Sequence, residues 1–179
     1  MSQLLIKLFN ESVNSFFAID IKNIEDDVAE RNLCARLAIH LTPKLFEYNI
    51  KGYFADPEYN RKQGGDVKTI LDEEESVIRI QCDLIVHSRG VFKGKDNLIA
   101  IEMKKSTRQE AEKISDRKRL RAMTKDSYDG IWSADGGTNP EHVCGYVVGV
   151  YMILNIKERI CILEYYQHGK QVNERTQVF

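Results

Sequence analysis

The first part of the chain and one later segment carry apolar residues at helical spacing. Over residues 3–18, leucine, valine and phenylalanine recur every three or four positions, which predicts an amphipathic helix. Residues 25–46 predict a second helix, whose opening acidic residues suit the positive end of a helix dipole. Pro43 is expected to kink or end that helix. Residues 107–125 predict a third helix, rich in lysine and arginine.

The remaining apolar runs are bounded by turn residues and predict strands. We expect these strands near residues 52–60, 77–87, 97–104, 143–156 and 159–167. The last two meet at a short turn at Lys157-Glu158 and predict a hairpin. The order helix, helix, strands, helix, strands is typical of an α/β or α+β fold. We expect a single domain over residues 1–179, since this length suits one core better than two.

The composition is that of a globular protein without a large net charge. Hydrophobic residues make up 42% and charged residues 30% of the chain, as in ordinary globular proteins. The formal net charge is −1, from 26 basic and 27 acidic residues, so the chain does not coat nucleic acid as a polycation. Any surface that binds phosphate must therefore be a local patch.

Cysteine spacing and the distribution of apolar residues suggest where the protein resides. None of the four cysteines lies in a C-x-x-C pair, which argues against a zinc ribbon, and each lies in an apolar run, which predicts buried thiols. The N-terminus lacks the pattern of a secretory signal. The longest apolar stretch, residues 143–156, is too short to span a bilayer. We expect a cytoplasmic protein that does not bind membranes.

Two of the predicted strands carry an isolated acidic residue. Because side chains alternate along a strand, Ala100, Glu102 and Lys104 share one face. Asp83 interrupts the preceding apolar run and shares a face with Ile85. If the two strands pair, two carboxylates and an ammonium group converge.

A third carboxylate comes from the second predicted helix. At 100° per residue, Glu30 lies on the same stripe as Leu33, Leu37 and Leu41, which should face the core. Burying an acid is costly unless its charge is offset, and a divalent cation would offset it. Asp27, one turn earlier, is the alternative residue, and simple pairing of Glu30 with an arginine is the alternative role.

Together, Glu30, Asp83 and the tripeptide Glu102-Met103-Lys104 resemble the PD-(D/E)xK nuclease superfamily, which includes restriction endonucleases. The resemblance rests on the strings AERNLCARLAIHL, QCDLIVHSRG and NLIAIEMKKS and covers roughly residues 25–130. Cys82 stands where the family has proline, which is not itself a ligand. The dipeptide Asp56-Pro57 contains the family's proline and aspartate in reversed order, so we do not take it as the family motif. The resemblance implies a restriction-endonuclease-like core, a mixed central sheet flanked by helices.

The resemblance also implies roles for these residues. Asp83, Glu102 and the backbone carbonyl of Met103 would bind Mg²⁺ or Mn²⁺, and Glu30 would complete the site directly or through water. Lys104 would position or activate the attacking water and stabilise charge on the phosphate. The implied activity is metal-assisted hydrolysis of phosphodiester bonds, in DNA more than RNA, by an endonuclease more than an exonuclease.

A basic stretch follows this tripeptide. Residues 103–125 contain nine basic residues against three acidic ones, which suits a surface that binds the phosphate backbone, although such runs are usually just solvated. The candidate nucleic-acid contacts are Tyr59, Arg61, Lys105, Lys118 and Arg121. Asp116, taken as opening the basic helix, is interpreted as a dipole partner rather than a ligand. A homodimer or a partner subunit would supply specificity, since one domain leaves little room for a separate reading module.

Two other classes of function stay open. The chain could be a catalytically silent nuclease fold that binds nucleic acid or a protein, or a regulatory subunit that sequesters a partner and binds no metal. The alternative for Asp83 and Glu102 is structural ion pairing with Lys104 and Arg89, although their joint presence favours catalysis, and His87 is more simply structural. The sequence contains no G-x-x-x-x-G-K-[ST] phosphate loop and no G-x-S-x-G nucleophile motif.

Overall fold

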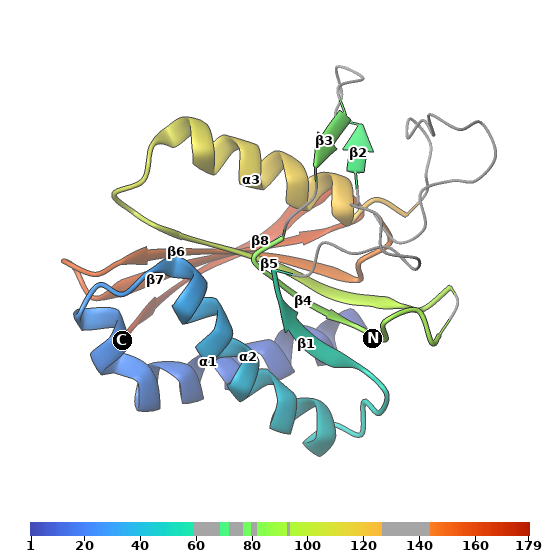
Figure 1. The fold of residues 1–179 in the computed structure, drawn as a ribbon, viewed down its shortest axis with the longest axis horizontal. Coiled ribbons are helices and arrows are strands. Elements are labelled where there is room, and N and C mark those ends of the chain that lie inside the picture. Colours follow the sequence, from blue (N-terminus) through green and yellow to red (C-terminus); the bar gives the residue numbers. More distant parts are fainter. Residues whose placement is uncertain (59–68, 72–76, 80–81, 93, 127–143) are drawn as a thin grey trace.

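The computed structural model describes residues 1–58, 69–71, 77–79, 82–92, 94–126 and 144–179. Over these residues the chain forms a mixed α/β fold, in which three helices flank a six-stranded sheet (Figure 1). Helices α1 (Ser2–Glu25) and α2 (Glu30–Glu47) cover one face of the sheet, and α3 (Glu110–Met123) covers the other. The predicted α/β class, with a mixed sheet flanked by helices, is confirmed.

The strand order places the residues of interest at the centre of the sheet. The order is β1 (Phe54–Pro57), β4 (Leu84–His87), β5 (Asn97–Lys105), β6 (Val148–Asn155), β7 (Ile160–Gln167) and β8 (Lys170–Val178). Among the described strands, only β5 and β6 pair in parallel, and the connection between them contains α3. Strands β2 (Thr69–Leu71) and β3 (Val77–Arg79) pair with each other in a separate two-stranded sheet.

The first two helices differ from their predicted bounds. Helix α1 continues to Glu25 because Asp20 and Ile24 extend its buried face, so the acidic residues expected to open the second helix lie at the junction. Helix α2 also passes through Pro43 and ends at Glu47. Proline cannot donate to the preceding turn, but Leu41 and Leu45 are both buried and hold this part of the helix on the core. Tertiary packing thus outweighs the local preference.

Two strand predictions also need correction. The run 77–87 does not form one strand, because β3 and β4 belong to different sheets. Strand β8 was not expected, since its sequence is polar and lacks an apolar alternation. It is an edge strand paired only with β7 over the described residues, and the turn before it has positive φ angles at His168 (50°) and Gly169 (73°). Such angles suit the tight turn of a hairpin.

The two faces of the sheet have different character. Toward α1 and α2, strand β5 presents Ile99, Ile101 and Met103 to an apolar core. Toward α3, it presents Ala100 and then Glu102, and this layer includes several charged side chains. All four cysteines are buried and unpaired, as predicted. The sheet therefore has one hydrophobic face and one face that mixes apolar and charged groups.

Among the helices that the structure describes, none combines the length and the hydrophobicity needed to cross a membrane.

Candidate active site

Asp83 and Glu102 lie side by side on the two central strands. The antiparallel register pairs Leu84 with Ile101, so Asp83, directly before β4, lies next to Glu102 on β5. One oxygen of Asp83 accepts a hydrogen bond from the backbone N–H of Met103 at 2.8 Å. The carboxylates that the sequence placed on two pairing strands are thus brought together.

Glu102 is fully buried and only partly satisfied. Its Oε1 accepts a hydrogen bond from Nε of Arg119 at 2.5 Å. Its Oε2 has no hydrogen-bond partner in the part of the chain that the structure describes. Burial and the neighbouring Asp83 carboxylate raise the pKa of Glu102 well above its usual range, against the opposing effect of Arg119. A buried carboxylate with one oxygen lacking a hydrogen bond destabilises the fold, and a further cation would offset its negative charge.

Lys104 lies among carboxylates. Its Nζ is 3.5 Å from Oδ2 of Asp116, and its side chain is largely buried. Burial alone lowers the pKa of Lys104, but the surrounding carboxylates outweigh burial and raise it. These carboxylates are Asp83, Asp116, Glu30 and Glu102. Lys104 is therefore held as an ammonium ion, suited to stabilising negative charge rather than to accepting a proton.

Glu30 reaches the end of β5 from the first turn of α2. Its Oε1 accepts hydrogen bonds from the backbone N–H of Lys105 at 2.9 Å and from Nε of Arg108 at 3.0 Å. Its Oε2 accepts from Nη2 of Arg108 at 3.2 Å. Asp27, the alternative to Glu30, pairs instead with the ammonium group of Lys105 at 2.6 Å. Glu30 is thus near Lys104 but forms an arginine pair, the simpler of the two roles considered for it.

The sequence interpretation missed two residues of this cluster, Asp116 and Arg119. The sequence pattern places Asp116 at the start of the basic helix. In the structure it lies in the middle of α3 and is buried. Arg119, one turn later, donates to both Asp116 and Glu102. Leu120 and Met123 complete the buried face of α3, so the spacing Asp116, Leu120, Met123 was the available signal. With only two apolar residues on that face, the signal was weak.

Among the described residues, no group of three or more histidine, cysteine or acidic side chains is arranged to hold a metal ion. The oxygens of Glu102 and Asp116 that lack hydrogen bonds nevertheless have the chemistry that Mg²⁺ prefers. Since Mg²⁺ commonly uses one or two carboxylates together with waters and phosphate oxygens, the residues fit the ion.

Most of the basic residues in the stretch 103–125 are neutralised by acidic residues, and four of these acids come from elsewhere in the fold. Six of the nine form ion pairs with residues that the structure describes: Lys104, Lys105, Arg108, Lys113, Arg117 and Arg119. Their partners include Asp27, Glu30, Glu102 and Glu164, which lie outside the basic stretch. The local positive excess seen in the sequence is therefore much reduced in the folded chain.

The candidate nucleic-acid contacts have different surroundings. Lys118 and Arg121 are exposed on α3 and are available to bind phosphate. Lys105 is largely buried and paired with Asp27. Tyr59 and Arg61 lie outside the described residues. The exposed part of the predicted surface thus consists of the outer face of α3.

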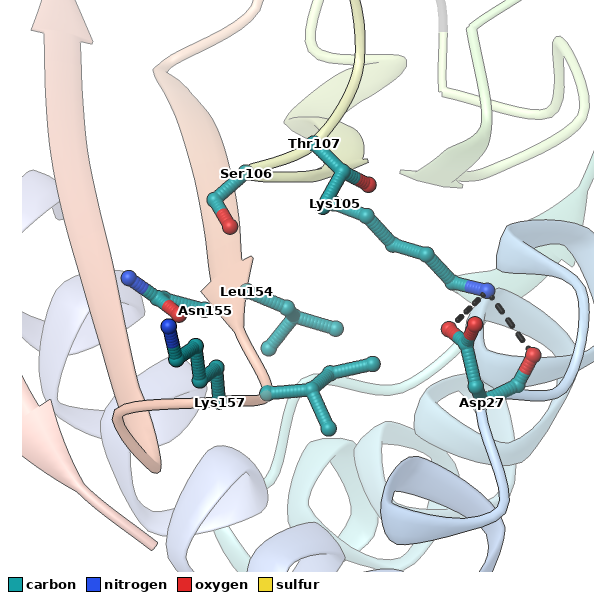
Figure 2. A pocket seen from close by; sticks show the side chains of 8 residues that line it. Asp27, Lys105, Ser106, Thr107, Leu154, Asn155 and Lys157 are labelled. Atoms are coloured by element: carbon teal, nitrogen blue, oxygen red, sulfur yellow. Dashed lines mark hydrogen bonds and ion pairs between the residues drawn. The ribbon is translucent and has the colours of Figure 1, made fainter.

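Lys105 lines a pocket at the C-terminal ends of β5 and β6 (Figure 2). In this view the ammonium group of Lys105 points toward Asp27. The hydroxyl groups of Ser106 and Thr107 lie near the backbone end of the Lys105 side chain. Leu154 supplies an apolar wall. The pocket is adjacent in sequence to Lys104, but the Asp27 carboxylate neutralises Lys105, one of the two lysines that line the pocket.

His87 and Asp56 form a separate polar contact at the other end of β4. Nε2 of His87 lies 2.9 Å from Oδ2 of Asp56, and Arg89 donates to both oxygens of Asp56 at 2.7 and 2.6 Å. Arg89 thus pairs with Asp56 rather than with Asp83 or Glu102. This agrees with a structural role for His87.

Searches of protein-family models, of curated proteins and of solved structures each found no match to this chain.

Proposed function

We propose that the chain is a metal-dependent nuclease that hydrolyses phosphodiester bonds, in DNA more readily than in RNA. The observation that carries this proposal is Glu102, which is fully buried beside Asp83 and has one oxygen without a hydrogen bond. A wholly structural carboxylate at this position would be expected to have its oxygens satisfied. The resemblance of these residues to the PD-(D/E)xK nucleases, and the α/β fold that brings them together, support the same activity.

Each residue of the site would have a separate role in this reaction. Asp83 and Glu102 would hold Mg²⁺ or Mn²⁺, with the carbonyl of Met103 and, directly or through water, Glu30. The bound ion would supply a water of lowered pKa and would neutralise charge on the phosphate. Lys104, kept protonated by its neighbours, would donate to a phosphate oxygen and stabilise the negative charge that develops there. Lys118 and Arg121 on the exposed side of α3 would bind the nucleic-acid backbone.

The test is incubation of the full chain with plasmid, linear duplex and single-stranded DNA, and with RNA, in Mg²⁺ or Mn²⁺. We expect cleavage that stops in EDTA, and a rate reduced by roughly 100-fold or more in Glu102→Gln and Lys104→Met, by analogy with loss of one charge-stabilising group. The matched controls are Glu174→Gln and Lys170→Met on the exposed strand β8, which should cleave at the wild-type rate. Absence of cleavage on every substrate, or equal cleavage by the site variants, would contradict the proposal.

A second candidate function is a catalytically silent fold that binds nucleic acid. The observation in its favour is that Glu102 and Glu30 already have arginine partners, Arg119 and Arg108. This candidate predicts binding of labelled DNA that is unchanged by EDTA, with no cleavage in either metal. An electrophoretic mobility shift with and without EDTA separates the two functions.

A further inference from the structure

Arg119 binds its carboxylate partners differently from three other arginines in the described part of the chain. Arg89, Arg108 and Arg117 each use Nε and Nη2 to bind both oxygens of one carboxylate. Arg119 uses the same two nitrogens for two different carboxylates, Glu102 and Asp116. These nitrogens form one edge of the planar guanidinium group, which normally matches a single carboxylate. Glu102 and Asp116 therefore lie close enough to share that edge.

This sharing leaves one oxygen of each carboxylate without a hydrogen bond. Arg119 is bonded to Oε1 of Glu102 and to Oδ1 of Asp116. Oε2 of Glu102 and Oδ2 of Asp116 are buried and make no hydrogen bond to any described residue. The exposed fractions of the two side chains are 0% and 4%. Oδ2 of Asp116 does form an ion pair with Nζ of Lys104, at 3.5 Å.

The charges of the cluster are also unequal. When all three of its carboxyl groups are ionised, as a bound cation would favour, Asp83, Glu102 and Asp116 are accompanied by only two cations, Lys104 and Arg119. Glu30 does not change this difference, because Arg108 neutralises it. A cluster with one excess negative charge and two buried oxygens without hydrogen bonds has the composition of a cation site.

We propose that Asp116 is a further ligand of the divalent cation in the proposed nuclease site, and that Arg119 is its positioning residue. The described acidic side chains do not by themselves form a group of three that could hold a metal, so the bound ion would draw the oxygen of Asp116 toward it. By holding one oxygen of Glu102 and one of Asp116, Arg119 fixes both carboxylates and leaves the other oxygen of each to bind the ion. Carboxylate ligands are commonly oriented by such hydrogen bonds from a second layer of residues. The inference rests on the proposed function, because it assigns new residues to the same cation.

The competing explanation is that Arg119 merely attaches α3 to β5. On that explanation, changing Arg119 or Asp116 alters stability and leaves the affinity for a cation unchanged. The affinity of the full chain for Mn²⁺, measured by electron paramagnetic resonance of free Mn²⁺ at a temperature where every variant is folded, distinguishes the two. Circular dichroism establishes that the variants are folded.

We expect Glu102→Gln and Asp116→Asn, both close in shape to the original residues, to weaken Mn²⁺ binding by about 10-fold or more. Arg119→Lys should weaken it by roughly 10- to 100-fold, since a lysine cannot present two parallel N–H donors to two carboxylates. The matched control is Arg117→Lys on the same helix, which alters a pair with the single carboxylate Glu164 and should leave Mn²⁺ affinity unchanged.

Three results would overturn the inference, in distinguishable ways. If Glu102→Gln weakens binding while Asp116→Asn and Arg119→Lys do not, the proposed function stands and the two new residues are structural. If Arg119→Lys tightens binding, Arg119 competes with the ion instead of positioning its ligands. If wild type does not bind Mn²⁺, or if Glu102→Gln binds it equally well, the proposed metal site itself is wrong.

Discussion

Asp20 and Glu102 are buried carboxylates on opposite sides of the sheet, and their hydrogen-bonding surroundings differ. In the helical layer of α1 and α2, Asp20 is 2% exposed and accepts hydrogen bonds from Arg36 at 2.6 Å and Asn23 at 3.0 Å, with Nε2 of His40 also 2.6 Å away. On the α3 face, Glu102 is 0% exposed and receives a hydrogen bond to one oxygen only.

The difference appears in the acidity of the two groups. Burial raises the pKa of Asp20, but the hydrogen bonds from Arg36 and with His40, together with the charge of Arg36, outweigh burial and lower it below the usual range. Burial and Asp83 raise the pKa of Glu102. Asp20 is thus surrounded by donors, as expected of a carboxylate that serves the fold. Glu102 is left incompletely satisfied, which under the proposed function is the cost in stability of a residue that serves chemistry.

The largest effect that this comparison predicts is on stability after Asp20→Asn. We expect a loss of about 3 kcal/mol in the free energy of unfolding, because the substitution leaves the partly buried Arg36 without its counter-ion. Urea unfolding followed by circular dichroism measures the change. Glu47→Gln, at an exposed acid near the end of α2, is the control and should change stability by less than about 0.5 kcal/mol. A loss no larger than that of the control would mean that Asp20 is not a structural ion-pair centre.

A smaller effect, of opposite sign, is expected for Glu102→Gln. This change removes one of three neighbouring negative charges and leaves Arg119 paired with Asp116. We expect the free energy of unfolding in the absence of divalent metal to rise by about 1 kcal/mol, as when a strained functional residue is replaced. The same urea titration, run in EDTA, provides the measurement. Destabilisation similar to that of Asp20→Asn would show that Glu102 is a structural residue. Asp20 and Glu102 would then no longer differ in role.

The smallest effect concerns the pH dependence of stability in acid. Because the folded pKa of Asp20 is lowered, its contribution is fully present above the unfolded value and is lost as the pH falls through the folded value. For an aspartate this loss begins below about pH 4. Asp20→Asn should therefore lose less stability than wild type on acidification below this pH. Thermal unfolding at a series of pH values tests the expectation, and parallel curves for the two proteins would refute it.

The sequence was sufficient to predict those parts of the fold whose pattern is strong. Alternation along residues 97–104 correctly assigned Glu102 and Ile101 to opposite faces, and the class of fold followed from the order of elements. Strand β8 could not be predicted, because an edge strand exposed along almost its whole length needs no apolar alternation. The passage of α2 through Pro43 depends on packing that a local pattern does not contain.

The candidate site was predictable only in part. Asp83 and Glu102 each interrupt an apolar strand, so their positions could be read and their proximity inferred from strand pairing. Asp116 and Arg119 lie on a helix with a narrow apolar face, where charged residues are expected and none is distinctive. Ion pairing was the other unpredictable property, because residues remote in sequence supply the acids that neutralise the basic stretch.

The connection of β5 to β6 through α3 has a consequence for the order in which the site is assembled during folding. The contact between Glu102 and Arg119 closes a segment of 17 residues, whereas that between Glu30 and Lys105 closes one of 75. Closing the longer loop costs roughly 1 kcal/mol more in chain entropy. We therefore expect β4, β5 and α3 to gather their charged groups early, before α2 docks, and Glu30 to arrive last.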